Sequence, residues 1–130
     1  LGLEDRLAQP VATLSAGQRQ SLTMIMATLQ DPDVLLLDEH LAALDPATAA
    51  RVLTLTTELV ASLGCTTLMV THNMDHALDV GNRLMDMSRG RVIVDLDETA
   101  KRRATITQLV DALSAAGDVV ADRTLLEAAG

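Results

Sequence analysis

A continuous apolar run, Val34-Leu35-Leu36-Leu37, constrains the fold of this chain more than any other feature of its sequence. Apolar and polar residues do not alternate in it, so both faces of the strand are expected to be buried, as in the parallel sheet of an α/β domain. Residues 66–70 predict a second buried strand. Asp45-Pro46 predicts the start of a helix between the two strands, and Gly64 its end. The sequence therefore predicts an α/β fold with helices flanking a parallel sheet.

Shorter periodic patterns predict the other elements. Apolar residues three and four apart between Leu22 and Leu29 predict a helix, which Asp31-Pro32 ends. Residues 74–80 predict a short helix, residues 83–96 a β-hairpin, and residues 105–115 a further helix. The residues from 116 onward are small, acidic and weakly patterned, so we expect them to pack loosely.

Composition excludes several classes of function. The 130 residues include no Phe, Tyr or Trp, which removes the aromatic platforms on which single-stranded nucleic acid stacks. The formal net charge of -8 disfavours a groove for nucleic-acid phosphates, so we expect no nucleic-acid partner. The single cysteine, Cys65, excludes an intramolecular disulfide. The longest uncharged stretch, residues 20–30, is too short to span a bilayer.

Two carboxylates, Asp38 and Glu39, directly follow the first buried strand. The carboxyl ends of parallel strands are where α/β domains bind ligands. One carboxylate at that edge can hold a hydrated Mg²⁺ ion, and its neighbour can take a proton from an attacking water. The alternative is that the two residues only begin a solvated loop, which is the commoner case for an isolated match.

A helix start that could attract an anion is predicted at Ser15-Ala16-Gly17-Gln18. Ser15 and Gln18 have the spacing of a capping box. The unpaired N–H groups of such a helix N-terminus attract a phosphate, and Gly17 lets an anion approach the backbone closely. The alternative is an ordinary capped helix without a ligand.

Two further polar residues flank the predicted strands. His72 ends the second strand at the same edge of the sheet, where its ring could bind a terminal phosphate; the alternative is a packing histidine. Asp45 precedes a helix, and its N-cap role is compatible with a second role. His72 and His76 are four residues apart, but Asn73 stands where a zinc-protease helix needs Glu, so we expect no zinc site.

In their order and spacing, these four motifs resemble the ATPase subunit of ABC transporters over residues 11–96. The resemblance implies that Ser15, Gly17 and Gln18 form the signature that closes over ATP bound by a partner subunit. The other roles that it implies are Mg²⁺ binding through water for Asp38, general base for Glu39, a loop contact across the dimer for Asp45 and a contact with the γ-phosphate for His72.

The sequence also departs from the family pattern. Ala16 stands where the signature usually has its first glycine, and Leu41 where Thr or Ser usually follows the acidic pair. The family binds ATP phosphates with a glycine-rich loop followed by Lys and Ser or Thr, but the only lysine here, Lys101, has no such loop before it. The resemblance therefore implies the C-terminal half of a P-loop ATPase domain, inactive alone, with the phosphate loop and the adenine-stacking ring expected upstream of Leu1.

The resemblance also implies a domain organisation and partners. Residues 1–30 would end the helical signature subdomain, residues 31–96 would form the hydrolytic half of the core, and residues 97–130 the C-terminal helix and tail. ATP and Mg²⁺ are the implied cofactors. The implied partners are a second ATPase subunit in a head-to-tail dimer, a transmembrane permease and, indirectly, a solute-binding protein, with the subunit on the cytoplasmic face of the plasma membrane.

A narrower resemblance concerns the transported solute. Three features resemble a subgroup thought to import amino acids, including tryptophan-like ones: His40, where most of the family has Pro, the segment Val70-Thr71-His72-Asn73-Met74, and residues 105–113. Two alternatives stay open: a non-transport ABC-type ATPase of DNA repair or translation, and a truncated interaction module without activity. Uncovered apolar strand edges would favour self-association of such a module.

Overall fold

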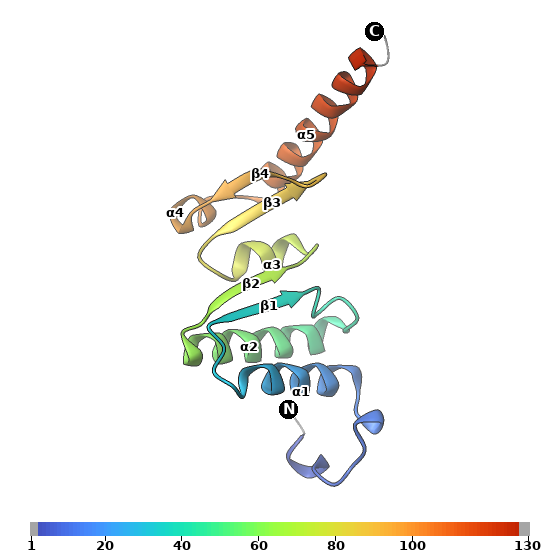
Figure 1. Cartoon of the computed structure of the whole chain (residues 1–130), viewed down its shortest axis with the longest axis vertical. Coiled ribbons are helices and arrows are strands. Elements are labelled where there is room, and N and C mark those ends of the chain that lie inside the picture. The colour runs from blue at the N-terminus through green and yellow to red at the C-terminus, as the bar shows by residue number, and fades with distance from the viewer. Residues whose placement is uncertain (1–2, 128–130) are drawn as a thin grey trace. The chain divides into compact units, whose positions relative to one another are not determined.

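The computed structural model describes residues 3–127 and divides the chain into two compact units, residues 1–72 and residues 73–130. We call them unit 1 and unit 2 (Figure 1). Unit 1 contains two 3-10 helices, η1 (Glu4–Arg6) and η2 (Val11–Thr13), then α1 (Ala16–Thr28), β1 (Val34–Asp38), α2 (Pro46–Leu63) and β2 (Thr66–Val70). Unit 2 contains α3 (Met74–Asp79), β3 (Leu84–Ser88), β4 (Arg91–Leu96), α4 (Glu98–Lys101) and α5 (Ile106–Glu127).

A two-stranded parallel sheet forms the centre of unit 1. β1 pairs with β2 in a register that runs from Val34 opposite Thr66 to Asp38 opposite Val70. The crossover between the two strands is α2, as parallel strands require. In Figure 1, α2 runs along the strands and α1 lies next to α2. Residues of both helices pack against Leu35 and Leu37, so α1 and α2 cover the same face of β1. The predicted α/β class, with helices flanking a parallel sheet, is thereby confirmed.

The core of unit 1 lies between that face and the two helices. One cluster centres on Met24 of α1 with Leu35 and Leu37 of β1, against which Leu59 and Val60 of α2 pack. A second cluster of Leu41, Ala49 and Val52 holds the loop after β1 onto the first turns of α2. The apolar residues of β1 thus fix both helices and the loop that follows the strand.

The predictions that both faces of β1 are buried and that β2 is a buried strand are wrong for this structure, since no residue of β2 is buried. Leu35 and Leu37 are 6% exposed, whereas Val34 is 56% and Leu36 is 69% exposed. Successive side chains of a strand point to opposite faces, and both helices of unit 1 cover the same one. The outer face of β1 therefore has no covering element from its own unit.

The helix α1 is confirmed, but its buried face differs from its apolar stripe. The residues that it buries are Gly17, Ser21, Met24 and Thr28, whereas Met26 and Leu29 are exposed. Small residues on the buried face let α1 approach α2 closely, and that contact outweighs the apolar pattern. The predicted ends of α2 are both confirmed, with Asp45 as N-cap and Gly64 at φ 63° as C-cap.

Unit 2 contains the predicted hairpin. β3 and β4 are antiparallel, and Arg89 and Gly90 both have positive φ at the turn, as a tight hairpin turn requires. The predicted short helix over 74–80 is confirmed as α3, whereas α4 was not predicted. The helix α5 continues past the predicted end at residue 115 to Glu127. The predicted loose packing of the tail lies outside the side chains that the structure describes.

The predicted domain boundaries after residues 30 and 96 stay predictions. Across residues 3–127, no helix combines the length and apolar character needed to cross a membrane.

Candidate functional site

The carboxyl edge of the β1–β2 sheet brings three predicted site residues together. Asp38 is the last residue of β1 and lies opposite Val70, and His72 follows two residues later. The backbone N–H of Glu39 donates to the carbonyl of Val70 at 3.0 Å, which extends the strand pairing by one residue. Glu39 has φ 46°, an uncommon value for a residue with a side chain, so the chain turns sharply at this point.

A direct contact joins Glu39 to His72. The distance from Oε2 of Glu39 to Nδ1 of His72 is 2.7 Å. A carboxylate oxygen accepts hydrogen bonds, so the imidazole donates through Nδ1–H. That arrangement leaves Nε2 for a ligand, and the His72 side chain is 74% exposed. The structure thus places a carboxylate and an oriented, accessible imidazole side by side.

Asp38 lies beside this pair with its side chain exposed. Among the described residues, its carboxylate has no hydrogen-bond or ion-pair partner. Among the side chains that the structure describes, no group of three or more His, Cys, Asp or Glu could hold a metal ion. Mg²⁺ keeps several waters and binds proteins through one or two carboxylates together with substrate phosphates. A single free carboxylate therefore fits Mg²⁺ held partly by a phosphate ligand, and does not fit a metal cage made by this chain alone.

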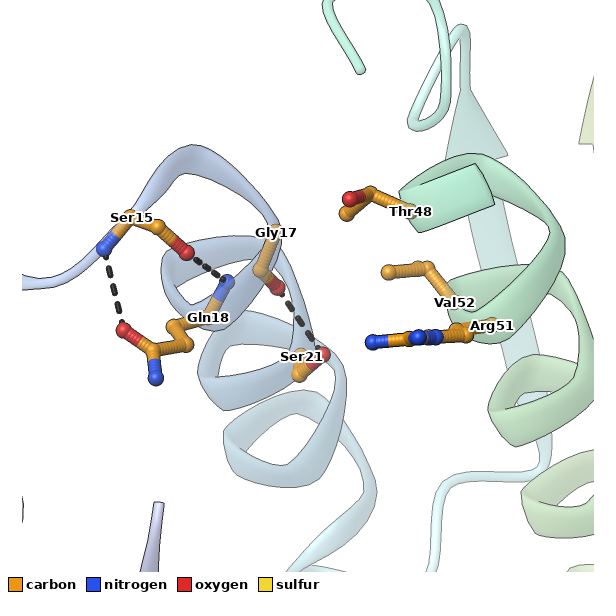
Figure 2. A pocket seen from close by; sticks show the side chains of 7 residues that line it. All are labelled: Ser15, Gly17, Gln18, Ser21, Thr48, Arg51 and Val52. Atoms are coloured by element: carbon orange, nitrogen blue, oxygen red, sulfur yellow. Dashed lines mark hydrogen bonds between the residues drawn. The ribbon is translucent and has the colours of Figure 1, made fainter. Parts of the chain in front are cut away.

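A pocket of about 570 Å³ lies between the start of α1 and the first turns of α2 (Figure 2). The predicted capping box at its rim is confirmed: the Gln18 N–H donates to Oγ of Ser15 at 3.2 Å, and the Ser15 N–H donates to Oε1 of Gln18 at 3.1 Å. The hydroxyl of Ser21 donates to the carbonyl of Gly17 at 2.9 Å. The residues that line the pocket are Ser15, Gly17, Gln18, Ser21, Thr48, Arg51 and Val52.

Gly17 is buried in this pocket, and its missing side chain has a steric cause. A Cβ atom on Gly17 would lie 2.2 Å from Cγ2 of Thr48 on α2. The sequence alone suggests that Gly17 serves the close approach of an anion. The structure adds that a methyl group of this chain already occupies the space beside its α-carbon.

Asp45 caps α2 next to the pocket. Its Oδ1 accepts the N–H of Thr48 at 3.1 Å. Hydrogen bonds from the side chain of Thr48, and then from its N–H, hold the pKa of the Asp45 carboxyl below its ordinary value. The N-cap role is confirmed, whereas a contact of Asp45 across a dimer stays a prediction.

The predicted residues therefore form two groups in unit 1. Asp38, Glu39 and His72 share the sheet edge, whereas Ser15, Gly17 and Gln18 line the pocket, with Asp45 linked to it through Thr48. Thr48 and Arg51 were not predicted to line a pocket. The spacing of three residues could have indicated that the N–H of Thr48 donates to the Asp45 cap. No local pattern in the sequence indicated that Thr48 and Arg51 lie next to α1.

The two departures in the loop after β1 have structural explanations. Leu41 is buried with Ala49 and Val52, so an apolar side chain fits where the family usually has a hydroxyl. Nε2 of His40 lies 3.2 Å from Oγ1 of Thr56, which ties this loop to α2. Both contacts hold the backbone that carries Glu39.

Comparison with known proteins connects this geometry to a family. Residues 1–42 match the family described as "ABC transporter". The chain is 47% identical over 111 residues to the tyrosine transport ATP-binding protein of Clostridioides difficile, which covers 85% of this chain and 44% of that protein. It is 40% identical over 93 residues to the methionine import ATP-binding protein MetN of Lactobacillus johnsonii, covering 72% of this chain and 27% of MetN.

A MetN of Streptococcus agalactiae is 36% identical over 111 residues, which make up 83% of this chain and 31% of that protein. The chain thus spans less than half the length of these relatives. The resemblance to ABC transporter ATPases, and the fold class that it implied, are confirmed.

Proposed function

We propose that this chain, a homologue of ABC transporter ATP-binding proteins, supplies the hydrolytic edge and the signature of an ATP site that drives solute import. The observation that carries the proposal is the 2.7 Å contact between Glu39 and His72, beside the free carboxylate of Asp38, at the carboxyl edge of a parallel sheet. This arrangement has a base, an accessible imidazole and a cation ligand in one place. Each is a component of phosphoryl transfer to water.

At this edge, Glu39 takes the proton of the attacking water. Its hydrogen bond to His72 orients the imidazole, whose Nε2 then reaches the terminal phosphate. Asp38 would hold Mg²⁺ through water, and the bound ion would neutralise charge on the phosphate oxygens. The sharp turn at Glu39 and the buried Leu41 keep the carboxylate at the strand end, so the base is in place before substrate arrives.

The pocket group acts on a nucleotide held by another subunit. Ser15, Gly17 and Gln18 stand at the N-terminus of α1, where the helix dipole favours the phosphate of an ATP bound by the partner. The partner is a second ATPase subunit in a head-to-tail dimer, which Asp45 contacts. The dimer drives a transmembrane permease from its cytoplasmic side, with a solute-binding protein acting indirectly. The names of the relatives support an amino acid as the solute.

The isolated 130-residue chain does not bind ATP tightly, because its sequence has no glycine-rich loop with a following Lys and Ser or Thr. Its exposed outer sheet face, with Leu36 and Leu68, supports self-association instead. Titration of the purified chain with Mg-ATP is expected to give no micromolar binding. Micromolar affinity would contradict the proposal that the 130-residue chain alone does not bind ATP tightly.

The test of the proposal is a chimera. The aligned 111 residues of the tyrosine transport relative are replaced by those of this chain, and ATP hydrolysis is measured with and without Glu39→Gln. The chimera is expected to hydrolyse ATP. The substitution is expected to lower kcat by about a hundredfold to ten-thousandfold, the usual contribution of a general base, while ATP binding persists.

Glu58→Gln is the matched control, because Glu58 is an exposed residue of α2 outside both site groups. It makes the same chemical change and is expected to leave kcat as it was. A chimera that binds ATP but does not hydrolyse it would overturn the proposed function. Equal rates for the Glu39→Gln and Glu58→Gln chimeras would overturn the role of Glu39.

A further inference from the structure

The start of α1 and the start of α2 meet at a contact between Gly17 and Thr48. A Cβ on Gly17 would lie 2.2 Å from Cγ2 of Thr48 but 3.7 Å from its Cβ. The first distance is far inside van der Waals contact, whereas the second is an ordinary contact. In Figure 2, Thr48 reaches from α2 toward α1. A single methyl group therefore decides whether a side chain fits at position 17.

Thr48 cannot move away from Gly17 without disturbing Asp45. Its N–H donates to Oδ1 of Asp45 at 3.1 Å, and its side chain contributes to the lowered pKa of that carboxyl. A β-branched residue in a helix has few allowed rotamers, so the methyl group has few ways to turn aside, and a side chain at position 17 would displace the backbone of Thr48 that caps against Asp45. The position of the Thr48 methyl group and the capping of Asp45 are thus linked.

We propose that Thr48 is a positioning residue that couples the signature helix to the Asp45 loop, so that the two move as one body. The proposal rests on the function proposed above, in which both groups approach the nucleotide of a partner subunit. It also gives Gly17 a role other than the close approach of an anion. The two explanations of Gly17 differ in their consequences, because only the packing role depends on what stands at position 48.

The kinetic consequence is specific. The nucleotide is bound by residues of another subunit, so a misplaced signature should slow hydrolysis and leave the apparent affinity for ATP unchanged. In the chimera, Gly17→Ala is expected to lower kcat by about tenfold to a hundredfold, the effect of a displacement of about 1 Å near a reacting group, with KM unchanged. Thr48→Ser, which removes only the methyl group, is expected to lower kcat slightly.

The double variant Gly17→Ala with Thr48→Ser is the decisive measurement. Serine keeps the hydroxyl group and the N–H that donates to Asp45 but removes Cγ2, so the methyl group introduced at position 17 faces only the Cβ of residue 48 at 3.7 Å. We expect its kcat to return to within about threefold of the parent chimera, because the displacement that cost about a hundredfold is gone. If Gly17 serves only anion approach, the double variant stays as slow as Gly17→Ala, and the proposal is overturned.

Two controls match the decisive variant. Thr48→Val keeps a γ-methyl group toward α1, so it is expected not to rescue Gly17→Ala. Ala16→Gly alters the neighbouring signature position. Its effect on kcat and the effect of Thr48→Ser are expected to be independent, so the double variant should show their combined effect and no more. Rescue by valine, or coupling at Ala16 as large as at Gly17, would contradict the assigned contact.

A measurement on the 130-residue chain separates this proposal from the proposed function. NMR titration of Asp45 is expected to show a higher pKa in Gly17→Ala, because the displaced Thr48 no longer donates fully to the carboxylate, and a restored pKa in the double variant. An unchanged Asp45 pKa in Gly17→Ala would overturn the coupling even if the chimera hydrolyses ATP. An inactive chimera with the expected Asp45 shifts would overturn the proposed function and leave the Gly17–Thr48–Asp45 linkage standing.

Discussion

The two units use their polar side chains differently. In unit 1 the predicted site residues stand at the ends of elements, where Ser15 and Asp45 cap helices and Glu39 and His72 meet beyond the strands. In unit 2 the charged side chains tie the elements of that unit to one another. Lys101 of α4 donates to the carbonyls of Val80 and Gly81 after α3. Every residue that the sequence analysis assigned to a site lies in unit 1.

Burial shows the same difference. In the part of the chain whose side chains are described, the buried apolar residues of unit 1 come from both helices, from β1 and from the loops beside them. In unit 2 they are Leu84 and Leu109, and Lys101 is buried alongside them at 5% exposure. The stability of unit 2 therefore depends on the buried ammonium group of Lys101, whereas the stability of unit 1 depends on apolar packing. Replacing Lys101 should destabilise unit 2 and leave the candidate site in unit 1 unchanged.

Replacing Lys101 by Met should have the largest effect on stability. The apolar stem is kept, but the Val80 and Gly81 carbonyls lose their ammonium donor, and hydrogen bonds to charged groups contribute about 1.5–3 kcal/mol. Burial lowers the pKa of Lys101, in agreement with a desolvated ammonium group. Hydrogen exchange should show faster opening of α3 and α4, with β1 and β2 as protected as before.

Arg102→Met is the matched control, because Arg102 is the next residue and its ion pair with Glu98 is exposed. Exposed pairs at this spacing contribute about 0.3–0.5 kcal/mol, so the control should open unit 2 much less. Equal loss of protection in β1 and β2 of the Lys101→Met chain would show that the two units unfold together.

Asp45→Ala should have an intermediate effect, confined to unit 1. Loss of an N-cap costs about 1 kcal/mol, and the loss should appear in α2. The pKa of Asp45 is lowered in the folded chain, chiefly by the side chain of Thr48. The stabilisation by this carboxylate is therefore complete above the unfolded pKa of about 3.9 and is lost as the pH falls through the lower folded pKa.

Denaturant unfolding at neutral pH and in acid measures this effect. The difference in the free energy of unfolding between the parent chain and Asp45→Ala should be largest at neutral pH and should shrink as the pH falls through the folded pKa of Asp45. Asp45→Asn keeps an acceptor oxygen without a titrating group, so its stability should stay near the parent value at neutral pH. If the free energies of unfolding of the parent chain and Asp45→Ala differ by the same amount at every pH, the charge of Asp45 is not the source of the stabilisation.

What the sequence predicted correctly is local. The capping box at Ser15, the Asp45 cap, the Gly64 end and the hairpin over 83–96 each depend on residues within a few positions of one another. The meeting of Glu39 and His72, 33 residues apart, also followed, because neighbouring parallel strands bring their carboxyl ends to one edge.

What the sequence did not predict depends on contacts between distant elements. The packing of Thr48 against Gly17 requires the distance between two helices, which no periodicity encodes. The short helix α4 ends at Lys101, whose ammonium group donates to carbonyls about 20 residues earlier in the chain. The exposed face of β1 depends on which side both helices take, and an apolar run gives the same pattern whether one face or both are covered.

The smallest predicted effect is at the Arg83–Asp95 pair of unit 2. Nε and Nη2 of Arg83 donate to the two carboxylate oxygens of Asp95 at 2.8 and 2.6 Å, which lowers the pKa of Asp95, yet both side chains are exposed. A double-mutant cycle with Arg83→Ala and Asp95→Ala should give a coupling of about 0.2–1 kcal/mol that vanishes in about 1 M salt. Coupling that persists in high salt would contradict the description of Arg83–Asp95 as an exposed ion pair.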